Sequence, residues 1–227
     1  WSRRLPETLA LDKRRPFTWS AVGQAGREVM THRATLSFIV AMTFLFAVMT
    51  TYLSGSEVIV EDVYKYGSWF PLIFGTLAVL LAIKSLNNAR VVQRMGINKL
   101  VRQSSLIAVG TSVLLLIVSF TNQGRPNFWL FFIALALVIP IAQGLVPNCN
   151  TAAMMPVPHI AGTASSIIAT VSTAGAALLG NLATSQFDGT VRPLALIIFT
   201  FISIGTIAIF IGTKATDASA NTAVTLS

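Results

Sequence analysis

Residues 127–150 read NFWLFFIALALVIPIAQGLVPNCN, and this stretch contains no charged residue. An α-helix needs about 20 mostly apolar residues to cross the hydrocarbon of a bilayer, so the stretch is long enough to span it. Pro140 and Pro147 interrupt helical hydrogen bonds only locally, which membrane helices tolerate. The stretch therefore predicts a transmembrane helix, and the rest of the chain repeats its pattern.

Apolar stretches of this kind recur along the whole chain, separated by charged segments or by segments rich in Gly, Pro, Asn and Ser. Each is expected to be a helix, because an open sheet edge in lipid would leave backbone groups unpaired. The six predicted spans are residues 34–54, 69–86, 104–120, 127–150, 162–183 and 193–212. The sequence thus predicts an all-α membrane protein with six transmembrane helices.

The composition of the 227-residue chain agrees with this class. Hydrophobic residues make up 54% and charged residues 11%, whereas a soluble domain carries about 25% charge. Cys149 is the only cysteine, which excludes a disulfide framework and a cysteine metal cluster. The formal net charge of +8 could indicate a nucleic-acid partner or anionic lipid.

The positions of the basic residues decide between these two partners. If both termini are cytoplasmic, all but three of the sixteen Lys and Arg residues lie on the cytoplasmic side. This asymmetry follows the positive-inside rule and explains the charge through the lipid bilayer, with no nucleic-acid partner. The outer side then holds Lys65, Arg125 and Arg192 with the acids Glu57, Glu61, Asp62 and Asp188.

The spans divide the chain into three expected parts. Residues 1–33 form a cytoplasmic linker, in which 17–32 is an amphipathic segment on the membrane surface. Residues 34–213 form the transmembrane bundle, and 214–227 form a cytoplasmic tail. The first residue is Trp1, which we interpret as a fragment, a processed product or a start inside a longer chain.

Three motifs follow one another along the chain. They are RLPETL at 4–9, YLSGS at 52–56 with EDVY at 61–64, and PHIAGTASS at 158–166. In this order and spacing they resemble the major facilitator superfamily, and most closely its bicyclomycin- and chloramphenicol-resistance branch of drug:proton antiporters.

The resemblance implies that the six spans correspond to family helices seven to twelve. They would form a half-bundle of two inverted three-helix repeats in a bacterial cytoplasmic (inner) membrane. The family's substrate cavity lies between this bundle and an amino-terminal six-helix half. The expected function is therefore that of the carboxy-terminal half of a secondary transporter, exporting drugs or other small molecules by alternating access.

The family also repeats a Gly- and Arg-rich cytoplasmic loop, which aligns with residues 88–99. Arg94 and Gly96 fit its pattern, but Gln93 stands at the acidic position and Ala89 at the first glycine. These departures leave the gating role of the loop open. The candidate loop residues are Arg90, Arg94, Gly96 and Lys99.

Aromatic and amide side chains within the spans are candidates for a substrate cavity, since such pockets are mostly apolar with a few polar groups. The competing interpretation is core or lipid packing for the aromatic residues and helix–helix hydrogen bonds for the amides. The candidates are Phe44, Tyr52, Phe74, Gln143, Asn148 and Asn150.

Small residues recur at steps of three or four in the span 162–183, which places them on one helical face. Small residues let membrane helices approach closely. The face predicts a tight helix contact, and a sliding contact between domains is the functional alternative. Its members are Ser165, Ala169, Ser172, Ala176 and Gly180.

No Asp or Glu lies well inside a predicted span, so a proton-coupling carboxylate would belong to the other half, or the chain would not pump. We find no nucleophile–base set, no phosphate-binding loop and no cofactor or metal signature, and we expect no enzyme activity. The second hypothesis is an accessory subunit that docks on a second copy of itself or on another membrane complex.

Overall fold

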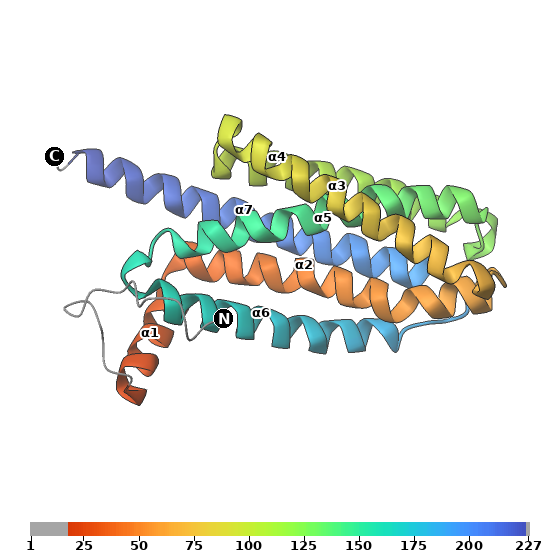
Figure 1. The fold of residues 1–227 in the computed structure, drawn as a ribbon, viewed down its shortest axis with the longest axis horizontal. Coiled ribbons are helices and arrows are strands. Elements are labelled where there is room, and N and C mark those ends of the chain that lie inside the picture. Colours follow the sequence, from red (N-terminus) through yellow and green to blue (C-terminus); the bar gives the residue numbers. More distant parts are fainter. Residues whose placement is uncertain (1–17, 226–227) are drawn as a thin grey trace, which may run out of the picture.

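The computed structural model describes residues 18–225 and is built from long helices (Figure 1). The motif at 4–9, together with Trp1 and Phe17, lies outside the described residues, as does the side chain of Ala89. The α-helices are α1 (Trp19–Thr31), α2 (Arg33–Val58), α3 (Phe70–Met95), α4 (Ile97–Ser119), α5 (Phe128–Met154), α6 (Ala161–Thr184) and α7 (Arg192–Thr225). Short helical turns, η3 (Ile59–Val63), η4 (Gly67–Trp69), η5 (Thr121–Gly124) and η6 (Pro158–Ile160), lie at their ends.

Six of these helices, α2 to α7, are long and apolar enough to cross a membrane. The predicted all-α class with six spans is confirmed, and the chain is a multi-pass membrane protein. Several helices continue past the apolar stretches that predicted them. α7, for example, runs on through residues 214–225, where a tail was expected.

Residues 88–99, expected as a loop, are helical on both sides of a single turn. α3 ends at Met95, α4 begins at Ile97, and Gly96 between them has φ of +75°. Only glycine adopts such a φ readily, which explains its place there. The sequence reading ended the spans at charged residues, but charged side chains are compatible with a helix once it has left the hydrocarbon.

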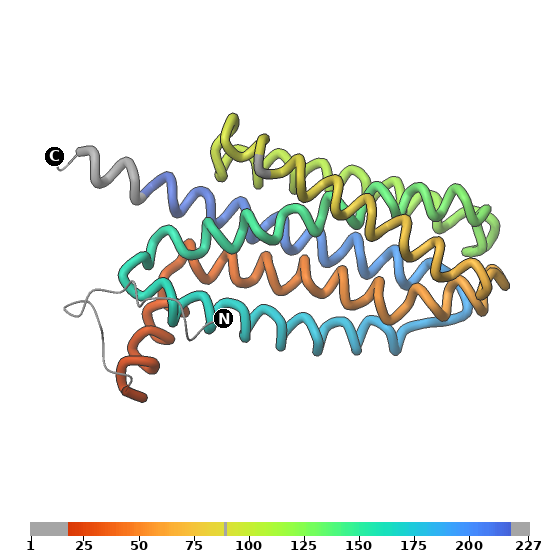
Figure 2. The backbone as a smooth tube through the Cα atoms, viewed as in Figure 1, coloured from red at the N-terminus to blue at the C-terminus, as the bar shows by residue number. Residues whose placement is uncertain are grey.

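The helix contacts repeat in a pattern that reveals two related halves. α2 packs on α5, α6 and α7, while α5 packs on α2, α3 and α4, and α4 also packs on α7. Exchanging α2 with α5, α3 with α6 and α4 with α7 preserves this pattern. The two units α2–α3–α4 and α5–α6–α7 are therefore arranged as expected for inverted repeats, with α2 and α5 at the centre (Figure 2).

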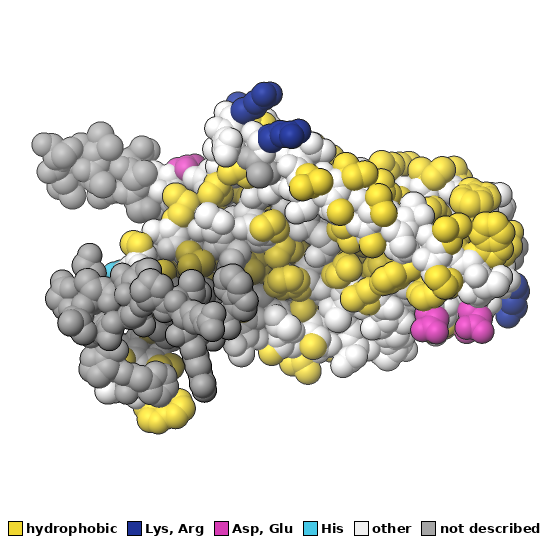
Figure 3. Space-filling view, in the orientation of Figure 1, with side chains coloured by type: hydrophobic (Ala, Val, Ile, Leu, Met, Phe, Trp, Pro, Cys, Tyr) yellow, Lys and Arg dark blue, Asp and Glu magenta, His cyan; other side chains and the backbone are white. Residues whose placement is uncertain are grey.

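Burial is unequal among the helices. In its most apolar window α3 has only 6% of its residues buried, against 50% for α2. α6, the counterpart of α3, comes next with 28%. The exposed side chains of α3 include Leu72, Val79 and Ile83. Apolar side chains accordingly cover much of the surface in Figure 3, and α3 and α6 are the helices left free to meet lipid or another bundle.

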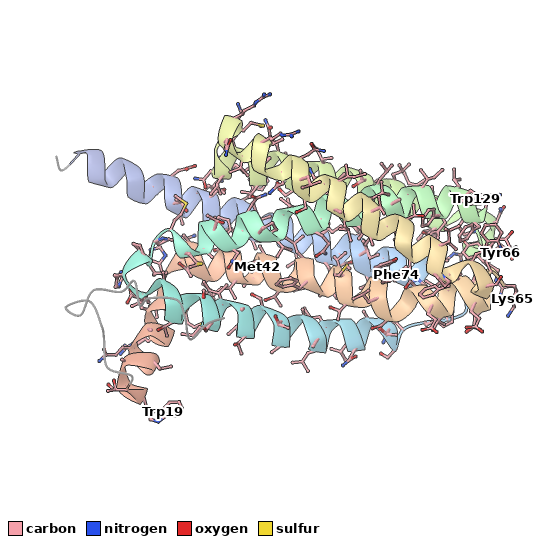
Figure 4. The ribbon with its side chains drawn as sticks, in the orientation of Figure 1. Trp19, Met42, Lys65, Tyr66, Phe74 and Trp129 are labelled. Atoms are coloured by element: carbon pink, nitrogen blue, oxygen red, sulfur yellow. The ribbon has the colours of Figure 1, made fainter. Side chains whose placement is uncertain are left out.

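The two ends of the bundle differ in character. Lys65, Tyr66 and Trp129 lie at one end and Trp19 of α1 lies at the other (Figure 4). Acidic side chains gather near the Lys65 end in Figure 3. The described carboxyl end of α7 lies at the same end of the bundle as α1 (Figure 1). The chain thus returns to the side from which its first span departs.

Helix α1 lies across the bundle rather than along it (Figure 1). Thr18 caps its start, and Ala25 and Val29 are buried. Trp19 is exposed on its other side. His159 Nε2 lies 2.9 Å from a carboxylate oxygen of Glu28 in α1, so α1 is tied to the turn before α6.

Small residues bring α6 close to α2. A Cβ on Gly175 would lie 2.7 Å from Thr43 Cγ2, and one on Gly180 would lie 2.7 Å from Thr50 Cβ. The Ser172 hydroxyl reaches the Ile39 carbonyl at 3.5 Å. The close helix contact that the small residues predicted is thus formed around Ser172, Ala176 and Gly180, all of which are buried.

The first turns of α6 differ from the predicted face. Ala169 is exposed and Ser165 only half-buried, whereas Ala164 and Ile168 are fully buried. The buried line follows a spacing of four residues back from Ser172. The prediction considered small residues alone and so passed over Ile168.

Gly180→Leu is expected to destabilise the bundle by about 1–3 kcal/mol, because the new side chain overlaps the β-branched Thr50. Gly110→Leu on α4 is the matched control, since nothing lies within 4 Å of its Cβ position. Thermal unfolding of the purified proteins in detergent measures both effects. Equal melting temperatures for the two variants would contradict the close α2–α6 contact.

Candidate functional site

Helices α3 and α5 run in the same direction and meet in register along a groove. Lys84 of α3 lies against Gly144 of α5, and Asn88, one turn later, meets Asn148, one turn after Gly144. Parallel neighbours are possible here because α4 returns the chain between them. The register places polar side chains from two helices at the same depth.

An amide pair joins the two helices. Asn88 Nδ2 donates to Asn148 Oδ1 at 3.1 Å, and Asn148 Nδ2 donates to Asn88 Oδ1 at 2.9 Å. Asn148 Nδ2 also donates to the Gly144 carbonyl at 3.0 Å. Asn148 is 6% exposed. Amides at membrane depth need such partners, and this pair supplies the main polar link between α3 and α5.

Gln143 links α5 to α2 in a similar way. Its Nε2 donates to the Leu45 carbonyl at 2.9 Å. Pro140 and Pro147 lie on either side of it in α5. Because proline lacks an N–H, the carbonyls four residues earlier, those of Ala136 and Gln143, lose their helical donors. This stretch of α5 therefore offers free acceptors as well as side-chain amides.

Lys84 adds a positive charge to the groove. Its side chain runs over Gly144, where a Cβ would lie 3.1 Å from Lys84 Cε and 3.3 Å from Cγ. The absence of a side chain at Gly144 therefore gives the lysine its place. Within residues 18–225, no ion pair of Lys84 is formed.

A cavity of about 250 Å³ opens between the two helices at this level. Its lining is partly apolar and partly polar, and Lys84 lies next to it over Gly144. The lining residues are Leu81, Ser85, Asn88, Pro140, Gln143, Gly144 and Pro147. The arrangement can hold a small organic molecule through apolar walls and a few directed hydrogen bonds.

A second hollow lies nearer the Lys65 end and is aromatic. It has a volume of about 330 Å³, and Tyr66, Trp69, Trp129 and Phe132 are among its lining residues. Trp69 and Trp129 are more than half exposed. Such amphipathic rings are typical of the membrane–water interface, so this hollow fits an interfacial belt better than a binding site.

The aromatic candidates lie apart from the polar groove. Tyr52 is buried and stacks on Phe74 with ring centroids 6.0 Å apart. Phe44 packs edge-on against Phe201 of α7 at 5.5 Å. Neither Tyr52 nor Phe44 lines the polar cavity. Both belong to the packing between helices.

Near Tyr52, a cluster of rings packs at the Lys65 end of α3 and α5. Tyr64 lies 5.1 Å from Phe128 and 6.1 Å from Phe131, centroid to centroid. Burial raises the pKa of the Tyr64 phenol, which therefore remains a neutral group across the physiological range. This end of α3 and α5 is sealed by apolar packing.

Of the predicted amides, the structure places Gln143 and Asn148 together in the groove. Asn150 is half-buried and makes no hydrogen bond among the described residues. The sequence analysis did not single out Lys84, Ser85, Asn88 or Gly144 as site residues. Only the register of α3 against α5 shows that these residues share one site.

The candidate loop residues lie at the junction of α3 and α4. Arg90, Arg94 and Lys99 are exposed there, on either side of Gly96. Beyond them, Arg102 of α4 forms an ion pair with Asp217 of α7 at 2.8 Å. The first turns of α4 and the last part of α7 are thereby joined by this ion pair.

Comparison with known proteins gives two matches. The family model described as Major Facilitator Superfamily matches residues 2–180. The Bicyclomycin resistance protein homolog of Haemophilus influenzae is 22% identical over 191 residues, which cover 84% of this chain and 47% of that protein. The chain thus spans about half the length of this relative. No solved structure matches the chain.

The amide pair can be tested by a double-mutant cycle. Asn88→Ala and Asn148→Ala should each destabilise the protein, with a coupling energy of about 0.6–1.7 kcal/mol between them, as for other hydrogen bonds between membrane helices. Asn88→Ala combined with Asn150→Ala is the control and should be additive, because no hydrogen bond joins those two residues. Additive effects for Asn88 and Asn148 would show that the pair is not formed.

Proposed function

Since the chain belongs to the Major Facilitator Superfamily, a family of transporters, we propose that it forms the carboxy-terminal half of a secondary transporter. It would export small molecules by alternating access, together with an amino-terminal six-helix half. The coverage of about half of the Haemophilus relative supports this reading. The exchange symmetry of the two three-helix units supports it as well.

The observation that carries the proposal is the polar groove between α3 and α5. Ionisable and amide groups are costly against lipid and are found where they face a bundle interior or a water-filled cavity. The groove lies beside α3, the least buried of the spans. A second bundle that covers this face would enclose the groove, and it would then form part of a wall of a substrate cavity.

Alternating access requires a rigid half that can rock against its partner. The contacts among α2, α4, α5 and α7, together with the close α2–α6 contact, provide such a body. α3 and α6, the two exposed helices, would slide along the other half. No Asp or Glu lies in the middle of the described spans, so we assign ion coupling to carboxylates of the partner half.

We further propose a bacterial cytoplasmic membrane as the location, with both termini in the cytoplasm. The end of the bundle at the α3–α4 turn carries Arg90, Arg94 and Lys99. The opposite end carries Glu61 and Asp62 beside Lys65. The positive-inside rule assigns the first of these ends to the cytoplasm.

This orientation is testable by cysteine labelling in a Cys149→Ala background, although native Cys149 is itself fully buried. A membrane-impermeant maleimide should label Asp62→Cys in intact spheroplasts and Arg94→Cys only after permeabilisation. Both positions are exposed in the structure. If Arg94→Cys were labelled in intact spheroplasts, the orientation would be opposite to the one proposed.

The transport function is testable in a strain without its own drug exporters. Expression of the complete protein should raise resistance to bicyclomycin, chloramphenicol or another member of a drug panel. Gln143→Leu should reduce that resistance several-fold, because it removes the α5–α2 hydrogen bond and a polar group of the cavity. Gln103→Leu, at an exposed position of α4, is the matched control and should have no effect.

A different outcome would favour the accessory role. If no compound of the panel were exported and the protein were purified from native membranes only with other subunits, the exposed α3 face would be a docking surface instead. Membrane abundance, measured by immunoblot, must be equal for the variants, so that a loss of folding is not mistaken for a loss of transport.

A further inference from the structure

We propose that the groove between α3 and α5 binds the anionic group of the transported molecule, a carboxylate in the simplest case, with Lys84 as its counter-charge. This inference rests on the proposed transport function and specifies its substrate class. The evidence is the position of Lys84 along its helix, its lack of an ion-pair partner among the described residues, the free donors beside it and the shape of the cavity.

Lys84 lies far from both ends of α3, and its side chain is half-buried in this bundle. Its span runs from Gly67 to Met95, which is eleven residues beyond Lys84. No other charged side chain in the described spans lies more than ten residues from both ends of its span. Arg90, the next basic residue of α3, is about 9 Å closer to the cytoplasmic end at 1.5 Å per residue. An ammonium group at this depth is costly unless it is paired.

No acidic side chain among the described residues lies close enough to form an ion pair with Lys84. α5, on which Lys84 lies, contains no Asp or Glu, and neither does α4, the other helix packed against α3. The acids of α2 and η3, which are Glu57, Glu61 and Asp62, lie toward the opposite end of the bundle. Asp217 is already paired with Arg102. Within residues 18–225, the positive charge in the groove therefore has no acidic side chain as its partner.

The charge of Lys84 and the free donors beside it favour an acceptor as ligand. The ammonium of Lys84 supplies donors, and one N–H of Asn88 stays free after its bond to Asn148. The Ser85 hydroxyl lines the same cavity. Asn148, in contrast, uses both N–H groups, on Asn88 and on Gly144. A carboxylate, which only accepts, would satisfy these groups.

The shape of the cavity favours a small organic acid over a lipid headgroup. Leu81, Pro140 and Pro147 give it apolar walls, and its volume of about 250 Å³ suits an aromatic ring system. Lipid phosphates lie at the membrane surface, nearer the level of Arg90 and Arg94. A carboxylate of the partner half would neutralise Lys84 but would leave the apolar part of the hollow unfilled.

The test measures binding of naphthoate and of its neutral isostere naphthamide to the complete protein in phosphatidylcholine nanodiscs, by equilibrium dialysis. Naphthoate should bind saturably, and Lys84→Met should weaken its binding about 10- to 100-fold, the loss typical of a charge-assisted hydrogen bond. Lys84→Arg, which keeps the charge, should bind more tightly than Lys84→Met. Naphthamide should bind to all three proteins equally.

The inference would be overturned if naphthoate did not bind, or if it bound equally tightly to the wild type and to Lys84→Met. Loss of naphthoate binding on adding phosphatidylglycerol would also overturn it, since the groove would then be a lipid site. The assay does not depend on transport. If naphthoate binding depended on Lys84 but no drug were exported, the transport proposal would fail and the anion site would stand. If drugs were exported but naphthoate binding did not depend on Lys84, the anion site would fail and the transport proposal would stand.

Discussion

The need to satisfy every polar group in a medium without water governs this structure. It dictates helices, and it also decides how polar side chains are used between them. Many hydroxyl groups bond to a carbonyl of their own helix, as Thr43 does to Ile39 and Thr50 to Phe46. A hydroxyl group that is bonded to its own helix needs no partner on the next helix, so the side chain acts as a small packing group. This lets α6 approach α2 closely.

The same constraint explains why the two repeats differ. α6 is held against α2 by small residues over much of its length, whereas its counterpart α3 contacts α5 less extensively. α3 is instead fixed to α5 at one level by the Asn88–Asn148 pair. A helix held by a polar link rather than by continuous packing leaves space beside that link, and the cavity at Gln143 and Gly144 is this space.

The sequence predicts the number and class of the spans because hydropathy is a one-dimensional signal. It also predicts that Gln143 and Asn148 need partners, but it does not say which, because partners depend on helix register. Lys84 shows the limit most clearly. From the sequence it is a lysine near the end of an apolar stretch, and only the missing side chain of Gly144 makes room for it inside. Ala169 shows the converse, since a small residue close to the right spacing still faces outward.

Paired and unpaired charges are distributed differently between the closely packed helices and the exposed helix α3. Between α4 and α7, which pack closely, the charges of Arg102 and Asp217 are paired. Along α3, Lys84, Arg90 and Arg94 form no ion pair within residues 18–225. A positive charge on such a poorly buried helix is stable in a membrane if water, lipid headgroups or a partner compensates it. The contacts among α2, α4, α5 and α7 build the scaffold, and α3 carries its unpaired charges at the edge of that scaffold.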